Sequence, residues 1–234
     1  MECYYTPPDR VSGTHLSITG DEFSHLTHVM RKKPGDVFHV VDGAGTLYRV
    51  NIERIEPGSV LCAILSREES PSEPSRRLTL AVGLLKQTAR FDMLVEKCTE
   101  LGIWSIVPLI TERTIARRAR SDRWHKLALA AMKQSGRSVL PAILNPVTFQ
   151  EFLPTPEPDS LRLIAHETIA SPSLRELTTP GQPRAYVCIG PEGGFTEREI
   201  RGALEAGFTP VGMGLRRLRT ETAAIVAVAS LLQE

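Results

Sequence analysis

The sequence predicts an α/β protein of two domains, in which a small β-barrel precedes a parallel sheet covered by helices. Before about residue 70 the apolar pattern is mostly that of short strands, and after residue 77 strand-like runs alternate with helical patterns. Between them, SREESPSEPSRR (66–77) has no apolar residue and is typical of a linker or long exposed loop. We therefore expect domains over residues 1–70 and 78–234, joined by a linker over 71–77.

The first part contains one predicted helix among several strands. TLYRVNIERI (46–55) alternates Tyr48, Val50 and Ile52 with polar residues, as a half-buried strand does. VFHVVDG (37–43) precedes it, and the DGAG turn between them predicts a hairpin. SVLCAILS (59–66) predicts another strand, and an apolar stripe predicts a helix over residues 21 to about 32 that ends before Pro34.

The second part has a regular alternation of elements. Strands are expected at LTLAVGLL (78–85), IWSIVPLI (103–110), LRLIAHE (161–167), RAYVCIG (184–190) and TPVGMG (209–214). One helix would carry the apolar face Phe91, Leu94, Val95, Cys98 and Leu101, and others would centre near Ala128, Arg201 and Val226. Alternation of this kind favours a parallel sheet with helices on both faces. Ligands of such sheets bind at the carboxyl ends of the strands.

Composition excludes few classes of function. The net charge of +1 and the 24% of charged residues do not indicate a nucleic-acid binder, so only a local basic patch could make it one. The four cysteines include no C-x-x-C pair, so we expect no disulfide framework and a reducing compartment. The start MECYYTPPDR lacks the apolar core of a signal peptide, and the apolar run 223–232 is too short for a bilayer. We expect a cytoplasmic protein.

Three loops at predicted strand ends carry unusual residues. The first has His166, the second is IGPEGGFTEREI (189–200), and the third, within GMGLRRLRTETAAIVAVA (212–229), leads to a helix opening around Thr222. In the second, Thr196 and Glu199 have the spacing of a capping box. A phosphate is a poor ligand, because both phosphate fingerprints are absent and Glu192 would repel an anion. A plain glycine turn that tightens the connection is the alternative.

The second and third loops together resemble a bacterial family of the SPOUT superfamily that methylates N3 of a uridine in 16S ribosomal RNA of the small subunit. FDMLVEKCTELGIWSIVPLITERT (91–114), AMKQSGRSVLPAI (131–143) and HLTHVMRKKPGDVFHVVDG (25–43) resemble further segments of that family, so the similarity covers both halves. It implies a PUA-like RNA-binding barrel, a trefoil knot in the second domain, S-adenosylmethionine as cofactor, and a homodimer with the active site near the interface.

The resemblance also implies which residues bind the cofactor: His166, Ile189, Gly190, Pro191, Glu192, Gly193, Gly194, Met213, Gly214, Leu215, Leu218, Arg219, Thr220, Thr222 and Ala223. A carboxylate suits a sulfonium cation, and glycines allow close approach of an adenine. The chain departs from the family pattern at Glu167, where many members have proline, and at Gln87 and Thr88, which replace Gly-Asp. Lys86 is therefore given no role.

Methyl transfer to N3 requires the uridine imide to lose its proton, which costs about 1.4 kcal/mol for each pH unit between its pKa and the medium. We expect Arg219 to donate to the flanking carbonyl oxygens as an oxyanion hole does, and Arg216 or Arg217 to orient the RNA. Glu192 or Glu221 would accept the proton, and the sequence does not choose between them. The alternative for the arginines is a solvated loop that binds backbone phosphate.

Arg10, Arg31, Lys32 and Lys33 are candidates for a phosphate-contacting patch, since family members use this domain on RNA. The alternative is a solvated helix end, where cations are favourable. His25 and His28 are three positions apart, but no third ligand lies near in sequence, so we expect no metal site.

Two other functions stay open at this point. One is a non-catalytic RNA-binding module, and the other is a SPOUT enzyme that acts on transfer RNA or on a ribose 2′-hydroxyl. If the protein is the uridine-N3 methyltransferase that the resemblance implies, its substrate is free 16S ribosomal RNA or the assembled small subunit.

Overall fold

The computed structural model describes residues 3–70, 72–115, 119–166, 174 and 182–232. They group into two compact units. The first comprises Met1–Glu73 and Leu129–Leu140, and the second comprises Pro74–Ala128 and Pro141–Glu234. This grouping differs from the predicted division in one segment, because residues 129–140 make their contacts with the first unit.

The first unit is built on a six-stranded sheet in the order β1-β4-β5-β6-β3-β2. Its strands are β1 (Cys3–Tyr5), β2 (Val11–Ser12), β3 (His15–Thr19), β4 (Val37–Val41), β5 (Thr46–Glu56) and β6 (Ser59–Glu69), with a short 3-10 turn η1 (Pro8–Arg10). Only β1 and β4 pair in parallel. One core cluster collects side chains from five of these strands together with Leu26. The predicted β-rich domain is therefore confirmed as a mostly antiparallel sheet.

The alternation predicted for β5 is confirmed, since Tyr48, Val50 and Ile52 are buried and the residues between them are not. The hairpin between β4 and β5 is confirmed too. There the Asp42 carboxylate accepts hydrogen bonds from the Ala44 and Thr46 amides at 2.8 and 2.9 Å. This carboxylate organises the turn together with the backbone hydrogen bond of 3.2 Å from the Asp42 amide to the Thr46 carbonyl.

Two local predictions in this unit were wrong. The helix is shorter than expected: α1 (Gly20–Ser24) runs into a π-helical turn η2 (His25–Val29), and the Lys32 amide then closes onto the Leu26 carbonyl at 3.1 Å. That closure ends the helix before residue 32. Residues 66–69, expected to be linker, continue β6 and pair with β5. Backbone pairing needs no apolar side chains, so composition could not reveal it.

The second unit has a parallel sheet in the order β10-β8-β7-β12-β11-β13, with β9 beside β8. Its strands are β7 (Arg77–Gly83), β8 (Ser105–Ile110), β9 (Ala142–Ile143), β10 (Val147–Thr148), β11 (Leu161–Ala165), β12 (Arg184–Ile189) and β13 (Thr209–Val211). Its helices are α2 (Thr88–Glu100), α3 (Ser121–Ser135, whose last part belongs to the first unit), α4 (Phe149–Phe152), α5 (Glu197–Glu205) and α6 (Thr220–Leu232). All five predicted strands are confirmed, whereas β9, β10 and α4 are too short to leave a sequence pattern.

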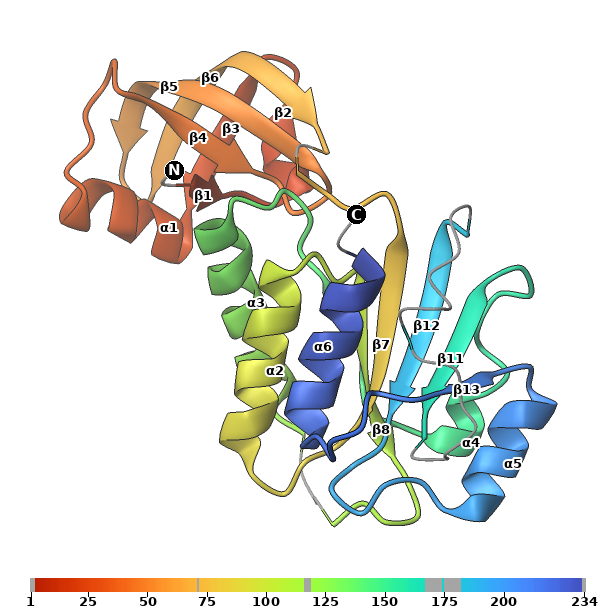
Figure 1. Cartoon of the computed structure of the whole chain (residues 1–234). Helices are drawn as coiled ribbons and strands as arrows, with labels where there is room; N and C mark the ends of the chain where they lie inside the picture. The colour runs from red at the N-terminus through yellow and green to blue at the C-terminus, as the bar shows by residue number, and fades with distance from the viewer. Residues whose placement is uncertain (1–2, 71, 116–118, 167–173, 175–181, 233–234) are drawn as a thin grey trace. The chain divides into compact units, whose positions relative to one another are not determined.

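Helices cover both faces of this sheet, as predicted (Figure 1). On one face α6 packs against β7, β12 and α2. There the rings of Phe91 in α2 and Trp124 in α3 stack with centroids 4.2 Å apart, and the indole donates to Asp92 at 3.1 Å. On the other face α4 and α5 cover a second apolar cluster that includes Phe149 and Phe195. None of the helices in the described ranges is both long and apolar enough to span a membrane.

Candidate active site

The loops that follow β11, β12 and β13 meet at one edge of the second unit. These strands are parallel neighbours of each other, so their carboxyl ends lie side by side. The His166 amide donates to the Val211 carbonyl at 3.0 Å, and the Leu174 amide donates to the Gly212 carbonyl at 3.3 Å. The Thr220 hydroxyl donates to the Gly190 carbonyl at 3.0 Å. These hydrogen bonds bring described residues of the three loops together.

The turn after β12, residues 190–195, packs backbone against backbone on the end of β7. A Cβ placed on Gly83 would lie 2.4 Å from the Pro191 nitrogen, far inside van der Waals contact. Within the turn the Gly194 amide donates to the Pro191 carbonyl at 2.8 Å, and Gly194 takes a left-handed φ of 68°. Only glycine adopts this conformation without strain. The turn is therefore compact and closely defined.

Side-chain-to-backbone hydrogen bonds tie this turn to neighbouring loops. Glu192 is exposed, and its Oε1 accepts a hydrogen bond from the Lys86 amide at 3.1 Å. Arg113, in the loop after β8, donates through Nη1 to the Gly193 carbonyl at 2.8 Å. No sequence motif indicated Arg113 as a site residue, because its partner is a backbone atom far along the chain.

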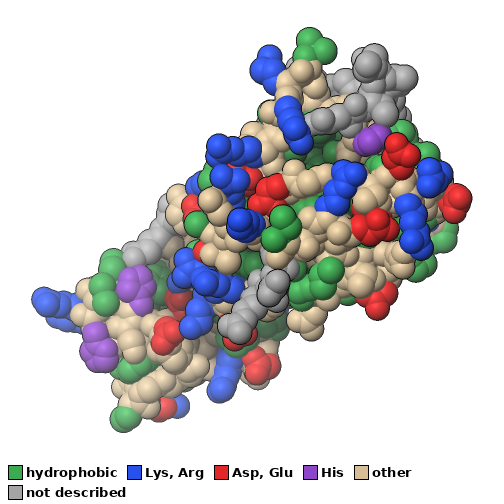
Figure 2. Space-filling view, turned by 90° about the horizontal axis from the view of Figure 1, so that it is seen from below, with side chains coloured by type: hydrophobic (Ala, Val, Ile, Leu, Met, Phe, Trp, Pro, Cys, Tyr) green, Lys and Arg blue, Asp and Glu red, His purple; other side chains and the backbone are tan. Residues whose placement is uncertain are grey.

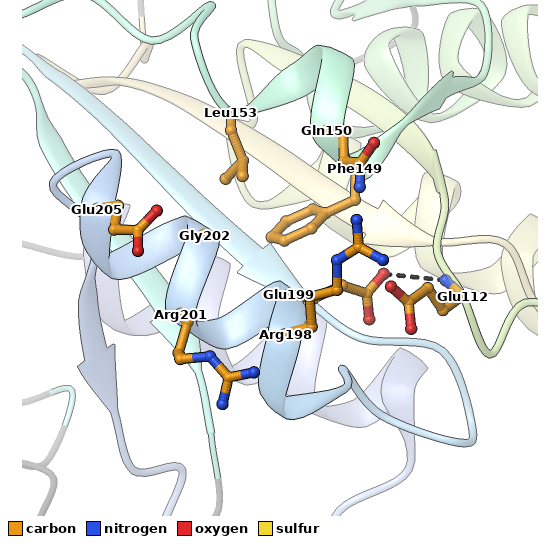
Figure 3. A pocket seen from close by; sticks show the side chains of 9 residues that line it. All are labelled: Glu112, Phe149, Gln150, Leu153, Arg198, Glu199, Arg201, Gly202 and Glu205. Atoms are coloured by element: carbon orange, nitrogen blue, oxygen red, sulfur yellow. Dashed lines mark hydrogen bonds between the residues drawn. The ribbon is translucent and has the colours of Figure 1, made fainter.

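The capping box at the start of α5 is confirmed. The Thr196 hydroxyl accepts from the Glu199 amide at 3.2 Å, and the Glu199 carboxylate accepts from the Thr196 amide at 2.8 Å. The same carboxylate accepts from the Glu112 amide at 2.9 Å, drawn as a dashed line in Figure 3. The helix therefore begins where the sequence predicts and is tied to the loop after β8.

A hollow of about 230 Å³ lies beside this cap, between α4 and α5 (Figure 3). Its lining includes Phe149, Leu153, Arg198, Arg201 and Glu205, and none of the described residues predicted for the site. The Glu199 carboxylate at its edge is already used by backbone amides. We therefore place the candidate site at the strand-end loops and not in this hollow.

The loop after β13 presents its charged side chains outward. Gly214 has a left-handed φ of 99°, and Leu215 after it is fully exposed. Arg216, Arg217 and Arg219 are exposed as well, while Met213 and Leu218 are half-buried. Helix α6 then begins at Thr220, two residues before the predicted Thr222, which is exposed; Ala223 is buried. The predicted arginines thus lie just before the start of α6 in the chain.

Glu221 differs from the other charged residues predicted for the site in being buried, with 5% of its surface exposed. Its Oε1 lies 3.6 Å from Nε of Arg90 in the first turn of α2. Within the described part of the chain, its Oε2 has no hydrogen-bond partner. A buried carboxylate with an unsatisfied oxygen requires an explanation. Arg90 is a second residue that no sequence motif indicated.

The other titratable groups near the site limit which nucleophiles and metal ligands it can offer. Burial raises the pKa of the Cys188 thiol, near the end of β12, far above its usual range. The thiol therefore stays protonated and is no nucleophile. Over the described residues, no three side chains of His, Cys, Asp or Glu lie close enough to hold a metal ion. Glu167, where the chain departs from the family pattern, lies outside the described residues.

The predicted RNA-contacting residues fall in both units. Arg10 ends η1, and Arg31 and Lys33 are exposed after η2, whereas Lys32 is half-buried. Arg216 and Arg217 belong to the loop after β13 of the second unit. Figure 2 shows a face on which Lys and Arg side chains gather, with Asp and Glu between them.

Comparison with known proteins identifies the family. Residues 71–232 match the model of an RNA methyltransferase domain, and residues 18–65 match that of an RNA methyltransferase PUA domain. Together the two matches cover both the parallel sheet with its strand-end loops and most of the antiparallel sheet.

Full-length relatives agree with these matches. The chain is 32% identical, over 231 residues, to ribosomal RNA small subunit methyltransferase E of Synechocystis sp., covering 96% of this chain and 75% of the relative. The crystal structure of the corresponding Neisseria gonorrhoeae protein, bound to S-adenosyl methionine, is 31% identical, with a TM-score of 0.87 and coverage of 98% and 96%. A Legionella pneumophila methyltransferase with bound SAM is 31% identical, with a TM-score of 0.84 and coverage of 98% and 96%. The chain therefore belongs to the SPOUT-type RNA methyltransferase family that contains ribosomal RNA small subunit methyltransferase E.

Proposed function

We propose that this protein transfers a methyl group from S-adenosylmethionine to N3 of a uridine in small-subunit ribosomal RNA. One observation carries the proposal. The hydrogen bond of 3.0 Å between Thr220 and Gly190 links the two segments that resemble the family signature, which supports assigning the glycine turn and the arginine loop to one site. The site lies at the carboxyl ends of parallel strands, where ligands of such sheets bind.

The residues present fit S-adenosylmethionine. A Cβ placed on Gly194 or Gly214 would have no atom within 4 Å, so open space adjoins the backbone of both loops. The unsatisfied Oε2 of Glu221 and the exposed carboxylate of Glu192 supply the negative charge that a sulfonium cation prefers. The cofactor supplies the methyl group that is transferred, and we assign to it the strand-end loops that the sequence predicts.

Arg219 is our candidate for the residue that activates the uridine. It is exposed and directly precedes α6, whose first amides carry partial positive charge. A guanidinium group there would donate to the carbonyl oxygens beside N3 and stabilise the imide anion, as oxyanion-hole donors do. Arg216, on the same loop, would orient the RNA through its phosphates.

Exposure favours Glu192 over Glu221 as the proton acceptor. Glu192 is open to solvent, whereas Glu221 is buried beside Arg90. A general base must be reached by the proton that it removes. The pH dependence of single-turnover methylation distinguishes them: Glu192→Gln should abolish the acid limb of the profile, and an unchanged limb in that variant would reassign the role to Glu221.

We also propose that the chain forms the trefoil knot of its superfamily. Support comes from the loops themselves, because residue 174 bonds to the segment after β13 and α6 bonds to the turn after β12. Such threading is very rare among proteins. It would hold the cofactor loops in place without disulfides or metal ions.

A homodimer is supported by the composition of α6. The helix TETAAIVAVASLL is apolar on both sides, and Val226 remains 39% exposed; Met93 of the adjoining α2 is 49% exposed. Apolar side chains on an outer helix face are typical of an interface. Sedimentation equilibrium tests this: we expect a dimer that Val226→Glu dissociates, and a monomeric wild-type protein would refute it.

The substrate would be 16S ribosomal RNA, free or in the assembled small subunit, which places the protein in the cytoplasm. The test is methylation with radiolabelled cofactor of naked ribosomal RNA and of small subunits from cells that lack this protein. Primer extension should then stop at one uridine, because N3 methylation blocks base pairing. Calorimetric binding of the cofactor without methylation of either RNA would contradict the proposal, and no heat would indicate an RNA-binding module.

A further inference from the structure

Arg31 occupies a backbone conformation that does not suit arginine. It follows the helical segment α1–η2 and has a φ of 52°, in the left-handed region. The Lys32 amide closes onto the Leu26 carbonyl at 3.1 Å, so Arg31 lies at the end of the helical segment, where a residue with a left-handed φ is usually glycine. A Cβ disfavours this region, so arginine makes the turn less stable than glycine would. Its side chain is exposed, so it contributes little to the core.

The residues just before Arg31 are also unusual. Val29 is 65% exposed and Met30 is 38% exposed, while Leu26 in the same segment is fully buried. The exposed His28 ring lies edge-on against Phe23, with centroids 6.0 Å apart and planes at 86°. An aromatic ring, two apolar side chains and an arginine therefore face solvent on one turn. We call residues 28–31 the contact turn.

This combination matches an unpaired nucleotide. A base that is splayed out of a helix stacks on aromatic or apolar side chains, and its phosphodiester is held by arginine. Double-helical RNA presents phosphates and 2′-hydroxyls to a protein. These groups would not contact apolar side chains such as Val29 and Met30 favourably. Strained backbone that the fold does not require is commonly retained for function.

We propose that the contact turn binds an unpaired nucleotide of the RNA substrate, and that arginine is kept at position 31, against the preference of the backbone, to hold its phosphodiester. This proposal rests on the proposed function, because it assumes an RNA substrate. It deepens that function by naming a single-stranded segment as what this turn recognises.

The first experiment separates the backbone of Arg31 from its side chain. Arg31→Gly should raise the thermal midpoint and weaken binding of a short uridine-rich single-stranded RNA by about 10-fold, with the slope of log affinity against log salt reduced by about one. Ser72→Gly is the matched control, since exposed Ser72 also has a left-handed φ, of 61°. It should raise the midpoint and leave RNA affinity unchanged.

Two results would overturn the role of Arg31. One is wild-type affinity and salt slope in Arg31→Gly, measured by fluorescence anisotropy. The other is a lowered thermal midpoint in that variant, because arginine would then serve the fold. Arg31→Lys should recover the salt slope, since it restores the charge.

The second experiment tests the unpaired strand. The double variant Val29→Ser, Met30→Ser should bind the single-stranded RNA more weakly with an unchanged salt slope, and should bind a blunt duplex of the same sequence as wild type does. Equal losses on both RNAs, or a loss on neither, would refute the proposal.

Methylation assays keep this inference apart from the proposed function. If the inference holds, Arg31→Gly raises KM for small subunits and leaves kcat unchanged. If wild-type protein methylates no ribosomal RNA, the proposed function fails, while the binding comparison of single strand and duplex still decides the inference.

Discussion

Single atoms determine the geometry of the candidate site. The glycine turn after β12 lies directly on the end of β7, where a Cβ on Gly83 would meet three atoms of Pro191 at 2.4–2.9 Å. These atoms belong to the backbone and ring of Pro191, and they cannot move aside as the end of a flexible side chain can. The absence of a side chain at residue 83 therefore sets the position of the turn.

Gly83→Ala should displace this turn. We expect a loss of about 1–3 kcal/mol in the free energy of unfolding, as for other overpacked sites, together with weaker binding of S-adenosylmethionine. Urea denaturation and calorimetry measure the two effects. In the control Gly202→Ala, the new Cβ lies 3.5 Å from Leu153 Cδ1 and within helix α5, so stability should rise by about 0.5–1 kcal/mol. Wild-type cofactor affinity in Gly83→Ala would contradict the assigned packing.

Arg219 is the residue on which the proposed chemistry depends. Arg219→Ala should lower kcat by about 10²–10³, the usual effect of removing one oxyanion donor, with KM for RNA little changed. Arg219→Lys keeps the charge but loses the planar pair of donors, so we expect partial activity. Single-turnover methylation of small subunits measures both. Full rates in both variants would show that Arg219 only binds phosphate.

At the scale of elements, a buried ion pair holds residues 129–140 in the first unit. Arg137 donates through Nη2 to Glu73 Oε2 at 2.7 Å, and the Ser138 and Val139 amides donate to Glu73 Oε1 at 2.9 and 3.0 Å. The side chains of Arg137 and Glu73 are 4% and 9% exposed. Arg137 Nε also donates to Glu73 Oε2, at 3.2 Å, so four donor groups depend on one carboxylate in a segment that the sequence predicts to be linker.

Glu73→Ala should destabilise the protein by about 3–5 kcal/mol, because it breaks a buried ion pair and removes the acceptor of the Ser138 and Val139 amides. The exposed Glu69 provides the control, and Glu69→Ala should change the free energy of unfolding by no more than about 0.5 kcal/mol. Chemical denaturation followed by circular dichroism measures both. Equal, small losses in the two variants would mean that this pair contributes nothing to stability.

At the scale of the whole molecule, folding makes all four cysteines unreactive. Each is buried, and burial raises the pKa of Cys3 to about 11 and of Cys62 to about 12, with Cys98 and Cys188 raised as well. The reactive form of cysteine is the thiolate. In the native protein these thiols therefore stay protonated at neutral pH.

We expect native protein at pH 8 to react negligibly with a thiol reagent, and unfolded protein to react at all four cysteines. Stability should also fall as the pH rises above the ordinary thiol pKa of 9.0, because the unfolded chain then loses protons that the folded chain keeps. Rapid labelling of a native thiol at pH 8, followed by mass spectrometry, would show that a cysteine is open to solvent.

Patterns between near neighbours were sufficient for much of the fold. The apolar alternation of β5, the runs of β7 and β12, and the capping box of Thr196 and Glu199 all reside in a few consecutive residues, and the structure confirms each. The end of the helix before Arg31 and the extension of β6 were missed. Both depend on hydrogen bonds that a local composition does not reveal.

By itself, the sequence determined the class of fold, the order of its elements, the loops at the strand ends and the family resemblance, because these are properties of short segments. Only the tertiary structure decided which distant groups meet. Glu221 is buried beside Arg90, whereas Glu192 is exposed. Pro191 packs against Gly83, and Glu73 forms an ion pair with Arg137. Such pairs are far apart in the chain, and packing rather than local preference brings them together.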